Sequence, residues 1–147
     1  MDISVIIPCR NEERHVAHCL ESLLAQRYPE DRYEILLADN MSTDRTVEIA
    51  RRYPRVTVVR EEKLSSYAAR NAAARIATGR ILAFTDADCE AAPDWLATIG
   101  DALRDERTAL VLGSRRFAHE GFVLRSLADY ETEKARFVYA QNDPRLY

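Results

Sequence analysis

Glycine is scarce in this chain. Only four of the 147 residues are glycine, and the first of them is Gly79. No glycine therefore follows the first apolar run, Ile3 to Ile7, where Pro8 stands instead. The dinucleotide-binding fingerprint and the P-loop both need glycine at that point, so that the backbone can approach a phosphate closely. Dehydrogenases and P-loop nucleotide hydrolases are thus disfavoured, although Asp39 would suit a ribose contact in a dehydrogenase.

Cysteine and histidine are also few, with three residues of each. Cys9, Cys19 and Cys89 are odd in number and show no CxxC spacing, which argues against a disulfide framework and against structural zinc. We expect reduced thiols. His15 and His18 flank the apolar stripe of a predicted helix, so we expect them in solvent rather than on a metal.

Long hydrophobic runs and a strong charge of one sign are absent as well. No apolar stretch approaches the roughly 18 residues of a membrane-spanning helix, and the N-terminus lacks the basic start of a secretory signal. These features predict a cytoplasmic protein. The net charge is −3, from 21 basic and 24 acidic residues, and no dense basic cluster is present. We therefore expect no nucleic-acid partner.

The remaining composition, 47% hydrophobic and 31% charged, is that of a soluble globular domain. Short apolar runs with little polar alternation are typical of parallel strands that are buried on both faces, and their spacing of about 20 to 30 residues suits crossover helices. Five runs have this character: Ile3 to Ile7, Ile35 to Ala38, Val56 to Val59, Ile81 to Phe84 and Ala109 to Leu112.

The segments between these runs carry apolar residues at helical spacing. We expect Ser42 to cap the second helix and Gly79 to stop the third. The four predicted helices are Arg14 to Gln26, the segment from Ser42 to Tyr53, Ala69 to Ile76, and Trp95 to Leu103.

This alternation predicts an α/β fold: a doubly wound, mostly parallel, Rossmann-like sheet with helices on both faces. We assign residues 1–115 to this α/β domain and residues 116–147 to a linker and a helix, roughly Phe122 to Gln141. The sheet supplies one wall of a ligand site, and the opposing wall is hard to find. We therefore expect a truncated catalytic domain, or one completed by a partner. A homodimer through the tail helix is one such arrangement.

Two carboxylates follow the apolar run that ends at Phe84. Asp86 and Asp88 are separated by Ala87, so in an extended segment both face the same side. Carboxylate oxygens suit Mg²⁺ or Mn²⁺, ions that usually keep positions open for substrate phosphates. The pair indicates chemistry on a phosphorylated ligand. The alternative is ordinary: acids after a strand often cap the next helix or lie in solvent.

Polar residues also follow two other predicted strands. Because the carboxyl ends of parallel strands meet at one edge, we expect Asp39, Asp86 and Asp88 to converge beside Arg10 and Arg70. Acids for a metal ion and guanidinium groups for phosphate or base are what a metal-diphosphate site needs. A solvated polar rim is the alternative interpretation.

In combination, these residues resemble the nucleotide-sugar-binding part of family 2 glycosyltransferases, which have the GT-A fold. The resemblance covers about residues 3–115, and it depends on the order and spacing of several short motifs. The motifs are Ser4-Val5-Ile6-Ile7-Pro8, Arg10-Asn11-Glu12-Glu13, Cys19 to Gln26, Glu34 to Asp39 with Ser42-Thr43-Asp44, Ala69-Arg70-Asn71, and Thr85-Asp86-Ala87-Asp88.

The resemblance implies roles for individual residues at the donor site. Asp39 corresponds to the residue that hydrogen-bonds the nucleobase. The backbone from Pro8 to Arg10, together with Glu12, corresponds to the cradle for base and ribose. Arg70 corresponds to a further donor contact. These roles come from the family and not from composition or spacing.

The same resemblance implies a metal-dependent, inverting reaction. Asp88 corresponds to the direct ligand of Mn²⁺ or Mg²⁺, and Asp86 to a ribose-side or water-mediated ligand. The implied activity transfers a sugar from a nucleoside-diphosphate sugar, with a UDP-sugar favoured, to the hydroxyl of a glycan, lipid or small molecule. A lipid acceptor would imply a peripheral membrane location.

Two departures from the family pattern stand out. Asn40-Met41 replaces a common aspartate and glycine, and Arg45 replaces another glycine, which leaves the base preference open. No catalytic base is recognisable, so we expect it beyond Tyr147. The other available carboxylates, none in a recognisable context, are Glu90, Asp94, Glu120 and Asp129.

Two other classes of protein fit the same residues. One is a non-catalytic module that binds a nucleotide sugar or a partner protein through the same half-fold. The other is a metal-dependent nucleotidyltransferase. That class usually has a glycine-rich or basic loop for the triphosphate, and the loop after Pro8 has one arginine and no glycine.

Overall fold

The computed structural model describes residues 1–105 and 107–113, and the unit described below is Met1–Val111. Its centre is a sheet of parallel strands in the order β3-β2-β1-β4. The strands are β1 (Ile3–Cys9), β2 (Tyr33–Asp39), β3 (Val56–Arg60) and β4 (Ile81–Phe84). The helices are α1 (Val16–Leu24), α2 (Thr46–Ala50), α3 (Ser66–Ile76) and α4 (Trp95–Ala102), with a short 3₁₀ turn at Glu30–Arg32.

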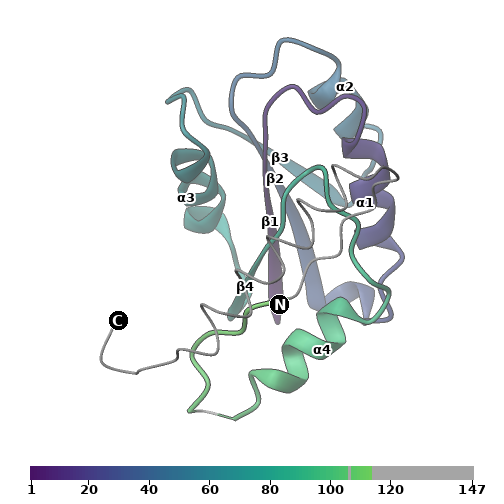
Figure 1. Cartoon of the computed structure of the whole chain (residues 1–147), viewed down its shortest axis with the longest axis vertical. Helices are drawn as coiled ribbons and strands as arrows, with labels where there is room; N and C mark the ends of the chain where they lie inside the picture. The colour runs from purple at the N-terminus through teal and green to yellow at the C-terminus, as the bar shows by residue number, and fades with distance from the viewer. Residues whose placement is uncertain (106, 114–147) are drawn as a thin grey trace, which may run out of the picture. The chain divides into compact units, whose positions relative to one another are not determined.

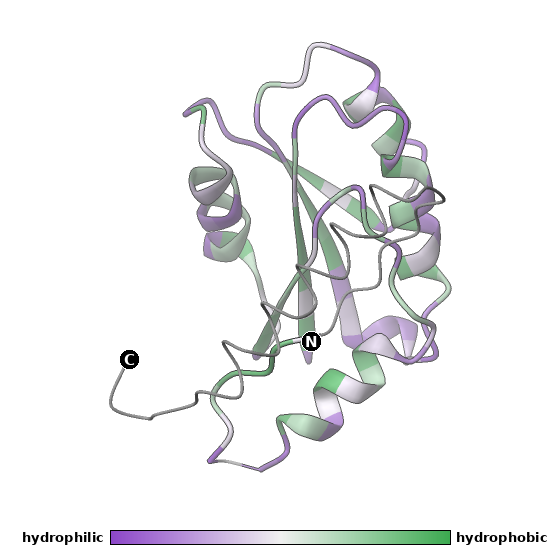
Figure 2. Cartoon of the chain, viewed as in Figure 1, coloured by the Kyte–Doolittle hydropathy of each residue, from purple (hydrophilic) through white to green (hydrophobic). Residues whose placement is uncertain are grey.

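Helices cover both faces of this sheet, as the sequence predicted (Figure 1). On one face, alternate residues of β1 and β2 pack against α1, α2 and Leu96 of α4. On the other face, Ile6 of β1 and Leu36 of β2 pack against Ala69 and Ala73 of α3. The small alanine side chains let α3 lie close to the sheet. Figure 2 shows the apolar residues concentrated in the strands and on the helix faces that meet them.

Strand β1 is buried along its whole length. All seven residues of β1 are buried, so this strand has no solvent face. A continuous apolar run of this kind is what a parallel sheet covered on both faces requires. Burying a large aliphatic side chain contributes about 1.5–3 kcal/mol, and β1 carries four, at Ile3, Val5, Ile6 and Ile7.

The fifth predicted strand is not formed. Residues 108–113 adopt neither helix nor strand, and Leu110 is 73% exposed. Within the described ranges no strand pairs with this segment, and a strand forms only where a neighbour satisfies its backbone hydrogen bonds. The apolar composition of this segment was therefore not sufficient to predict a strand. The predicted tail helix, Phe122 to Gln141, lies outside the described residues.

Several helix bounds differ from the sequence prediction, and the residue that ends α3 is not the predicted one. α2 is only five residues long and ends at Ala50, before the predicted end at Tyr53. α3 ends at Ile76 with Ala77 as its C-cap, so Gly79 is not the residue that stops it. Gly79 instead passes against the backbone of β1, where the side-chain hydroxyl of Ser4 accepts a hydrogen bond from its N–H at 2.9 Å.

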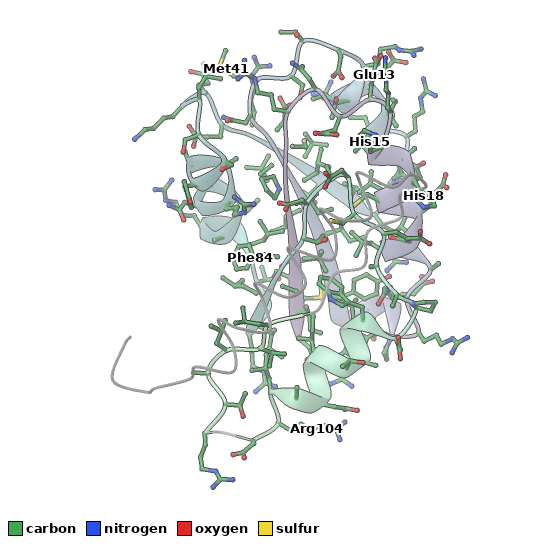
Figure 3. The ribbon with its side chains drawn as sticks, in the orientation of Figure 1. Glu13, His15, His18, Met41, Phe84 and Arg104 are labelled. Carbon is green, nitrogen blue, oxygen red and sulfur yellow. The ribbon has the colours of Figure 1, made fainter. Side chains whose placement is uncertain are left out.

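Other predictions about single residues are confirmed. Cys9, Cys19 and Cys89 are free thiols. The side chains of His15 and His18 are 57% and 67% exposed, and Figure 3 shows both beside α1. None of the helices within the described residues has the length and apolar character needed to cross a membrane.

Glu34 joins β2 to the segment that leads into β4. Its Oε1 accepts hydrogen bonds from Ser4 Oγ at 2.6 Å and from the N–H and Oγ1 of Thr78 at 2.7 and 2.8 Å. Burial acts to raise the pKa of Glu34, but these hydrogen bonds outweigh it and hold the pKa below its usual value. The ionised carboxylate is therefore a structural bridge between β1, β2 and β4.

This bridge predicts an acid-sensitive contribution to stability. A lowered folded-state pKa stabilises the fold above the unfolded-state pKa, and the contribution is lost as the pH falls through the folded-state value. Glu34→Gln is expected to lower the urea midpoint near pH 7 and to have less effect near pH 3. The exposed Glu62→Gln variant is the control. An equal loss from Glu34→Gln at both pH values would contradict the assignment.

Candidate active site

The strand order creates a crevice at the carboxyl edge of the sheet. The chain proceeds from β1 to β2 to β3 in one direction and then returns to place β4 on the other side of β1. Loops that follow β1 and β4 therefore diverge, and ligands of open α/β sheets bind at such a point. A pocket of about 440 Å³ lies here. Its lining residues are Pro8, Cys9, Arg10, Glu12, Asn40, Leu64, Ser65, Ser66, Arg70, Asp86, Ala87 and Asp88.

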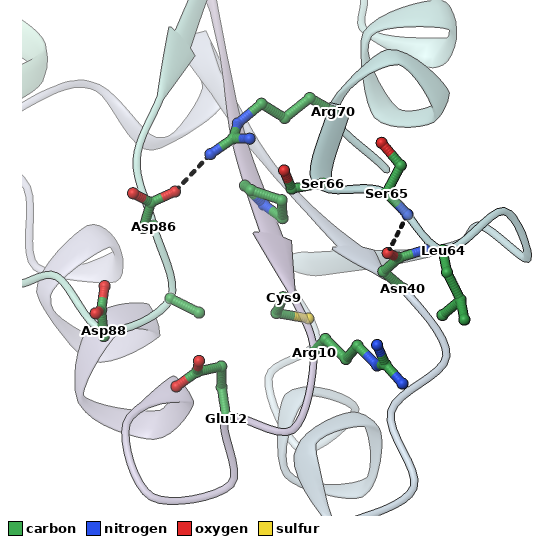
Figure 4. Close-up of a pocket in the computed structure, with 12 residues that line it drawn as sticks. Cys9, Arg10, Glu12, Asn40, Leu64, Ser65, Ser66, Arg70, Asp86 and Asp88 are labelled. Carbon is green, nitrogen blue, oxygen red and sulfur yellow. Dashed lines mark hydrogen bonds and ion pairs between the residues drawn. The ribbon is translucent and has the colours of Figure 1, made fainter. Parts of the chain in front are cut away.

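The pocket brings together most of the residues that the sequence singled out. Those that line it are Pro8, Arg10, Glu12, Arg70, Asp86 and Asp88. Its two ends differ in chemistry, as Figure 4 shows: Glu12, Asp86 and Asp88 gather at one end, and Asn40 and Leu64 lie at the other.

Asp39 is the exception among the predicted residues. It does not line the pocket, and only 2% of its surface is exposed. Met41, with a φ of 61°, turns the chain so that Ser42 folds back and donates its N–H to Asp39 Oδ1 at 3.0 Å. The third carboxylate at the pocket is therefore that of Glu12, contrary to the predicted convergence of Asp39. The base contact of Asp39 stays a prediction.

The loops after β1 and β2 are held together by hydrogen bonds. Asn11 has a φ of 57°, a left-handed conformation that asparagine tolerates better than most residues. Its N–H donates to Ser42 Oγ at 3.0 Å, and its Oδ1 accepts from the N–H of Thr43 at 2.8 Å. These contacts fix the turn that carries Arg10 and Glu12 to the pocket.

A second set of contacts anchors this turn to the start of α2. The N–H of Glu12 donates to Thr46 Oγ1 at 2.8 Å, and the N–H of Glu13 donates to Asp44 Oδ2 at 3.0 Å. Asp44 Oδ1 also accepts from the N–H of Thr46 at 2.9 Å. The side chain that serves the first turn of α2 is thus Asp44 and not the predicted Ser42. Ser42 instead holds the neighbouring loop.

The carboxylate of Glu12 has a fixed direction. Its Oε2 lies 2.9 Å from Nδ1 of His15, one turn along the chain, and 30% of its side chain is exposed. The backbone oxygen of Glu12 also accepts the N–H groups of His15 and Val16 at 3.0 and 2.9 Å. The backbone and one carboxylate oxygen are thus engaged away from the pocket.

Asp86 is paired with Arg70 of α3. The distance between Arg70 Nη2 and Asp86 Oδ1 is 2.7 Å, and the two side chains are 30% and 49% exposed. A pair this exposed contributes only about 0–1 kcal/mol to stability. Its consequence is geometric: the guanidinium and the carboxylate are held together on one side of the pocket.

The segment from Asp86 to Cys89 forms a tight turn. The N–H of Cys89 donates to the carbonyl oxygen of Asp86 at 3.1 Å. Ala87 is 3% exposed and belongs to the main apolar core, while Asp86 and Asp88 line the pocket. Asp86 and Asp88 thus reach the pocket from a turn and not from the predicted extended segment, and Ala87 is among the lining residues as well.

The residues present fit a divalent metal that is completed by a ligand. Within the described ranges no three acidic, histidine or cysteine side chains form a ready-made cage. Mg²⁺ and Mn²⁺ do not need one, because they are commonly bound by one or two carboxylates with phosphate oxygens and waters in the other positions. Asp88 is exposed at the pocket, and the recorded contact of its carboxylate is a long one, 3.6 Å from Cys89 Sγ.

The thiol at the pocket is not suited to nucleophilic chemistry. Burial, reinforced by the nearby carboxylates of Asp39 and Glu12, raises the pKa of Cys9 to about 12. Burial likewise raises the pKa of Cys19 to about 12. The thiolate is the nucleophilic form, so both cysteines are inert packing residues at neutral pH.

Comparison with known proteins identifies the family. The sequence model described as Glycosyl transferase family 2 matches residues 4–145. The chain belongs to this family. It is 37% identical over 122 residues to Glycosyltransferase AglE of Haloferax volcanii, covering 80% of this chain and 40% of that protein. The chain thus spans about two fifths of this family 2 relative.

Solved structures of other glycosyltransferases share the fold. The S. aureus TarS 1–349 structure superposes with a TM-score of 0.74 at 26% identity, covering 83% of this chain and 38% of that one. The mannosyltransferase PcManGT from Pyrobaculum calidifontis, solved with GDP-Man and Mn²⁺, gives a TM-score of 0.67 at 36% identity and covers 70% and 32%. The predicted GT-A fold is thereby confirmed.

Sequence reasoning missed one wall of this family 2 pocket. Leu64, Ser65 and Ser66 line it from the loop between β3 and α3. The signal in the sequence was a serine just before the third predicted helix, because serine is a common N-cap residue. Ser65 is indeed the N-cap of α3 and accepts a hydrogen bond from the N–H of Ala68 at 3.4 Å. A loop that leaves β3 must emerge at the same carboxyl edge as the loops after β1 and β4.

Proposed function

We propose that residues 1–113 form the donor-binding part of a metal-dependent, inverting glycosyltransferase. The donor is a nucleoside-diphosphate sugar, and the acceptor is a hydroxyl group. The observation that carries this proposal is the pocket between the ends of β1 and β4, with the carboxylates of Glu12, Asp86 and Asp88 gathered at one end and Arg10, Asn40 and Leu64 at the other. Such a pocket matches a ligand with a charged diphosphate and a less charged nucleoside.

The family 2 neighbours support the choice of donor. TarS 1–349 has been solved with UDP and with UDP-GlcNAc, at TM-scores of 0.73 and 0.71 to this chain. PcManGT has been solved with GDP-Man and Mn²⁺. We favour a UDP-sugar, as the sequence resemblance implied. The UDP-bound TarS structures cover 83% of this chain at 26% identity, and the GDP-Man complex of PcManGT covers 70% at 36% identity.

We assign Asp86, Asp88 and Arg70 to the metal and the diphosphate of the donor. Asp88, with Asp86 beside it, would hold Mn²⁺ or Mg²⁺ at the diphosphate. When bound, the metal neutralises the negative charge that develops on the departing diphosphate, which is Lewis-acid chemistry. The Arg70 guanidinium, kept in place by its 2.7 Å contact with Asp86, adds hydrogen-bond donors on the same side of the pocket.

The other end of the pocket receives the nucleoside. Arg10 lies there in the loop after β1, and Leu64 and Ser65 lie there in the loop before α3. Glu12 presents its carboxylate at the acidic end, where we expect it to accept hydrogen bonds from hydroxyl groups of the donor. Asp39 contacts the base if the loop around Met41 opens, because its carboxylate is now held by Ser42.

Transfer also needs a base for the acceptor hydroxyl. We propose that this group lies outside residues 1–147, in the part of the longer relatives that this chain does not span. The chain alone is then expected to bind the donor with negligible turnover.

The proposal is tested by calorimetric titration of UDP, GDP, CDP and dTDP, each with and without Mn²⁺, followed by an assay for UDP release from UDP-sugars. We expect Mn²⁺-dependent binding of one nucleotide, most strongly UDP, and little UDP release. A folded chain that binds none of the four nucleotides would refute donor binding. Rapid Mn²⁺-dependent transfer to an added acceptor would refute the placement of the base.

A further inference from the structure

Asn40 is a buried side chain with a complete set of hydrogen bonds. Its residue surface is 5% exposed. Its Nδ2 donates to the carbonyl oxygens of Glu61 and Lys63 at 3.0 and 2.8 Å, and its Oδ1 accepts the N–H of Ser65 at 2.9 Å. A single amide at the end of β2 thus holds three points of the loop between β3 and α3.

This loop forms a wall of the pocket. Leu64, Ser65 and Ser66 line it, and Figure 4 shows the contact between Asn40 and the N–H of Ser65 beside them. Ser65 is also the N-cap of α3, the helix that carries Arg70 to its contact with Asp86. The position of Asn40 therefore fixes where this wall stands, while Arg70, further along α3, is held separately by its 2.7 Å contact with Asp86.

The wall lies at the nucleoside end of the site. Under the proposed function, the diphosphate and its metal are at the end that holds Asp86 and Asp88. A nucleoside diphosphate of extended shape then places its ribose and base against the opposite end, where Asn40 and Leu64 lie. Contacts to the wall should therefore affect the nucleoside and leave the diphosphate alone.

The amide cannot be replaced by a carboxylate without loss. Both hydrogen atoms of Nδ2 point to carbonyl oxygens, of Glu61 and Lys63. An ionised aspartate at this position would face the same two carbonyls with an acceptor, and a buried charge without a donor is costly. Asparagine here is thus matched to a loop conformation that brings two carbonyl oxygens towards the end of β2.

We propose that Asn40 is a positioning residue that holds the Leu64–Ser66 wall for the nucleoside and thereby sets the base preference. This inference depends on the proposed function and extends it to one residue. Asn40 acts through the loop, because its amide is occupied by Glu61, Lys63 and Ser65.

The test compares Asn40→Asp with the wild-type chain and with Asn71→Asp. The control makes the same chemical change at an exposed residue of α3 that does not line the pocket. UDP, GDP and inorganic pyrophosphate are titrated with Mn²⁺ by calorimetry. We expect Asn40→Asp to weaken UDP binding about tenfold and to change the UDP-to-GDP affinity ratio, because a hydrogen-bond network of this kind is lost. Pyrophosphate binding should stay within twofold of the wild-type value.

Leu64→Ser provides a second variant, because a side chain that is 59% exposed can be changed with little risk to folding. It should weaken UDP binding and spare pyrophosphate binding, even if Asn40→Asp fails to fold. If a folded Asn40→Asp variant binds UDP and GDP with the same affinities as the wild-type chain does, the inference is overturned. Unchanged UDP binding by Leu64→Ser would also overturn it. Absence of UDP binding by the wild-type chain would overturn the proposed function and this inference with it.

Discussion

Replacing Asp88 with asparagine is expected to weaken Mn²⁺-dependent UDP binding by about 100-fold or more, because a direct ligand should cost at least as much as the outer-shell partners of a metal, whose loss costs about 10- to 100-fold. The carboxylate is exposed at the pocket, and the amide that replaces it is a neutral and weaker ligand. Electron paramagnetic resonance of Mn²⁺, titrated in the presence of UDP, measures the effect. Because Asp88 lies on the surface, the free energy of unfolding should change by less than about 0.5 kcal/mol.

Asp94→Asn is the matched control for this experiment. Asp94 is an exposed acid at the start of α4, it does not line the pocket, and its side chain makes no capping hydrogen bond. The control should bind Mn²⁺ and UDP as the wild-type chain does. Equal loss of Mn²⁺ binding in both variants would indicate a general effect of charge, and undiminished binding by Asp88→Asn would remove Asp88 from the metal site.

Replacing Gly79 with alanine is expected to destabilise the fold by about 3 kcal/mol, at the upper end of the usual cost of overpacking. A Cβ at this position would meet the backbone N of Ser4 at 2.5 Å and the backbone C of Ile3 at 2.6 Å. Neither atom can move away, because both belong to the central strand β1. The variant must therefore push β4 from β1 or lose the pairing of Ile3 with Ile81.

Gly100→Ala is the control for that variant. Gly100 lies within α4, where a Cβ would meet nothing closer than the hydroxyl oxygen of Tyr28 at 3.7 Å. Alanine in a helix interior is favoured over glycine by about 0.5–1 kcal/mol, so this variant should be as stable as the wild type or slightly more stable. Urea denaturation of both variants measures the difference. A Gly79→Ala chain of wild-type stability would contradict the close approach to β1.

Features determined by local pattern were predictable from the sequence. The runs that form β1 and β2 are apolar without polar alternation, and this pattern indicates strands of a parallel sheet that is buried on both faces. Asp86 and Asp88 follow β4 at the carboxyl edge of the sheet, and both line the pocket, although from a turn and not from the extended segment that was predicted. The order of these motifs also sufficed for the family.

Features determined by distant contacts were not predictable. The segment from Ala109 to Leu112 has the composition of a strand and lacks a partner within the described residues. Gly79 was expected to stop a helix because glycine is common at helix ends. In the structure, glycine is needed there because the backbone of β1, far away in the sequence, leaves no room for a Cβ. Asp39 was expected at the pocket, but the turn at Met41 delivers Ser42 to its carboxylate instead.

We propose that a nucleoside diphosphate and a divalent metal bind together between the ends of β1 and β4. The most direct test records backbone amide NMR signals of the chain with UDP while small amounts of Mn²⁺ are added. We expect selective broadening at Glu12 and at Ala87 to Cys89, while the signals of Ile3 and Ile81, at the opposite edge of the sheet, stay sharp. Broadening centred elsewhere, or none when UDP is present, would contradict it.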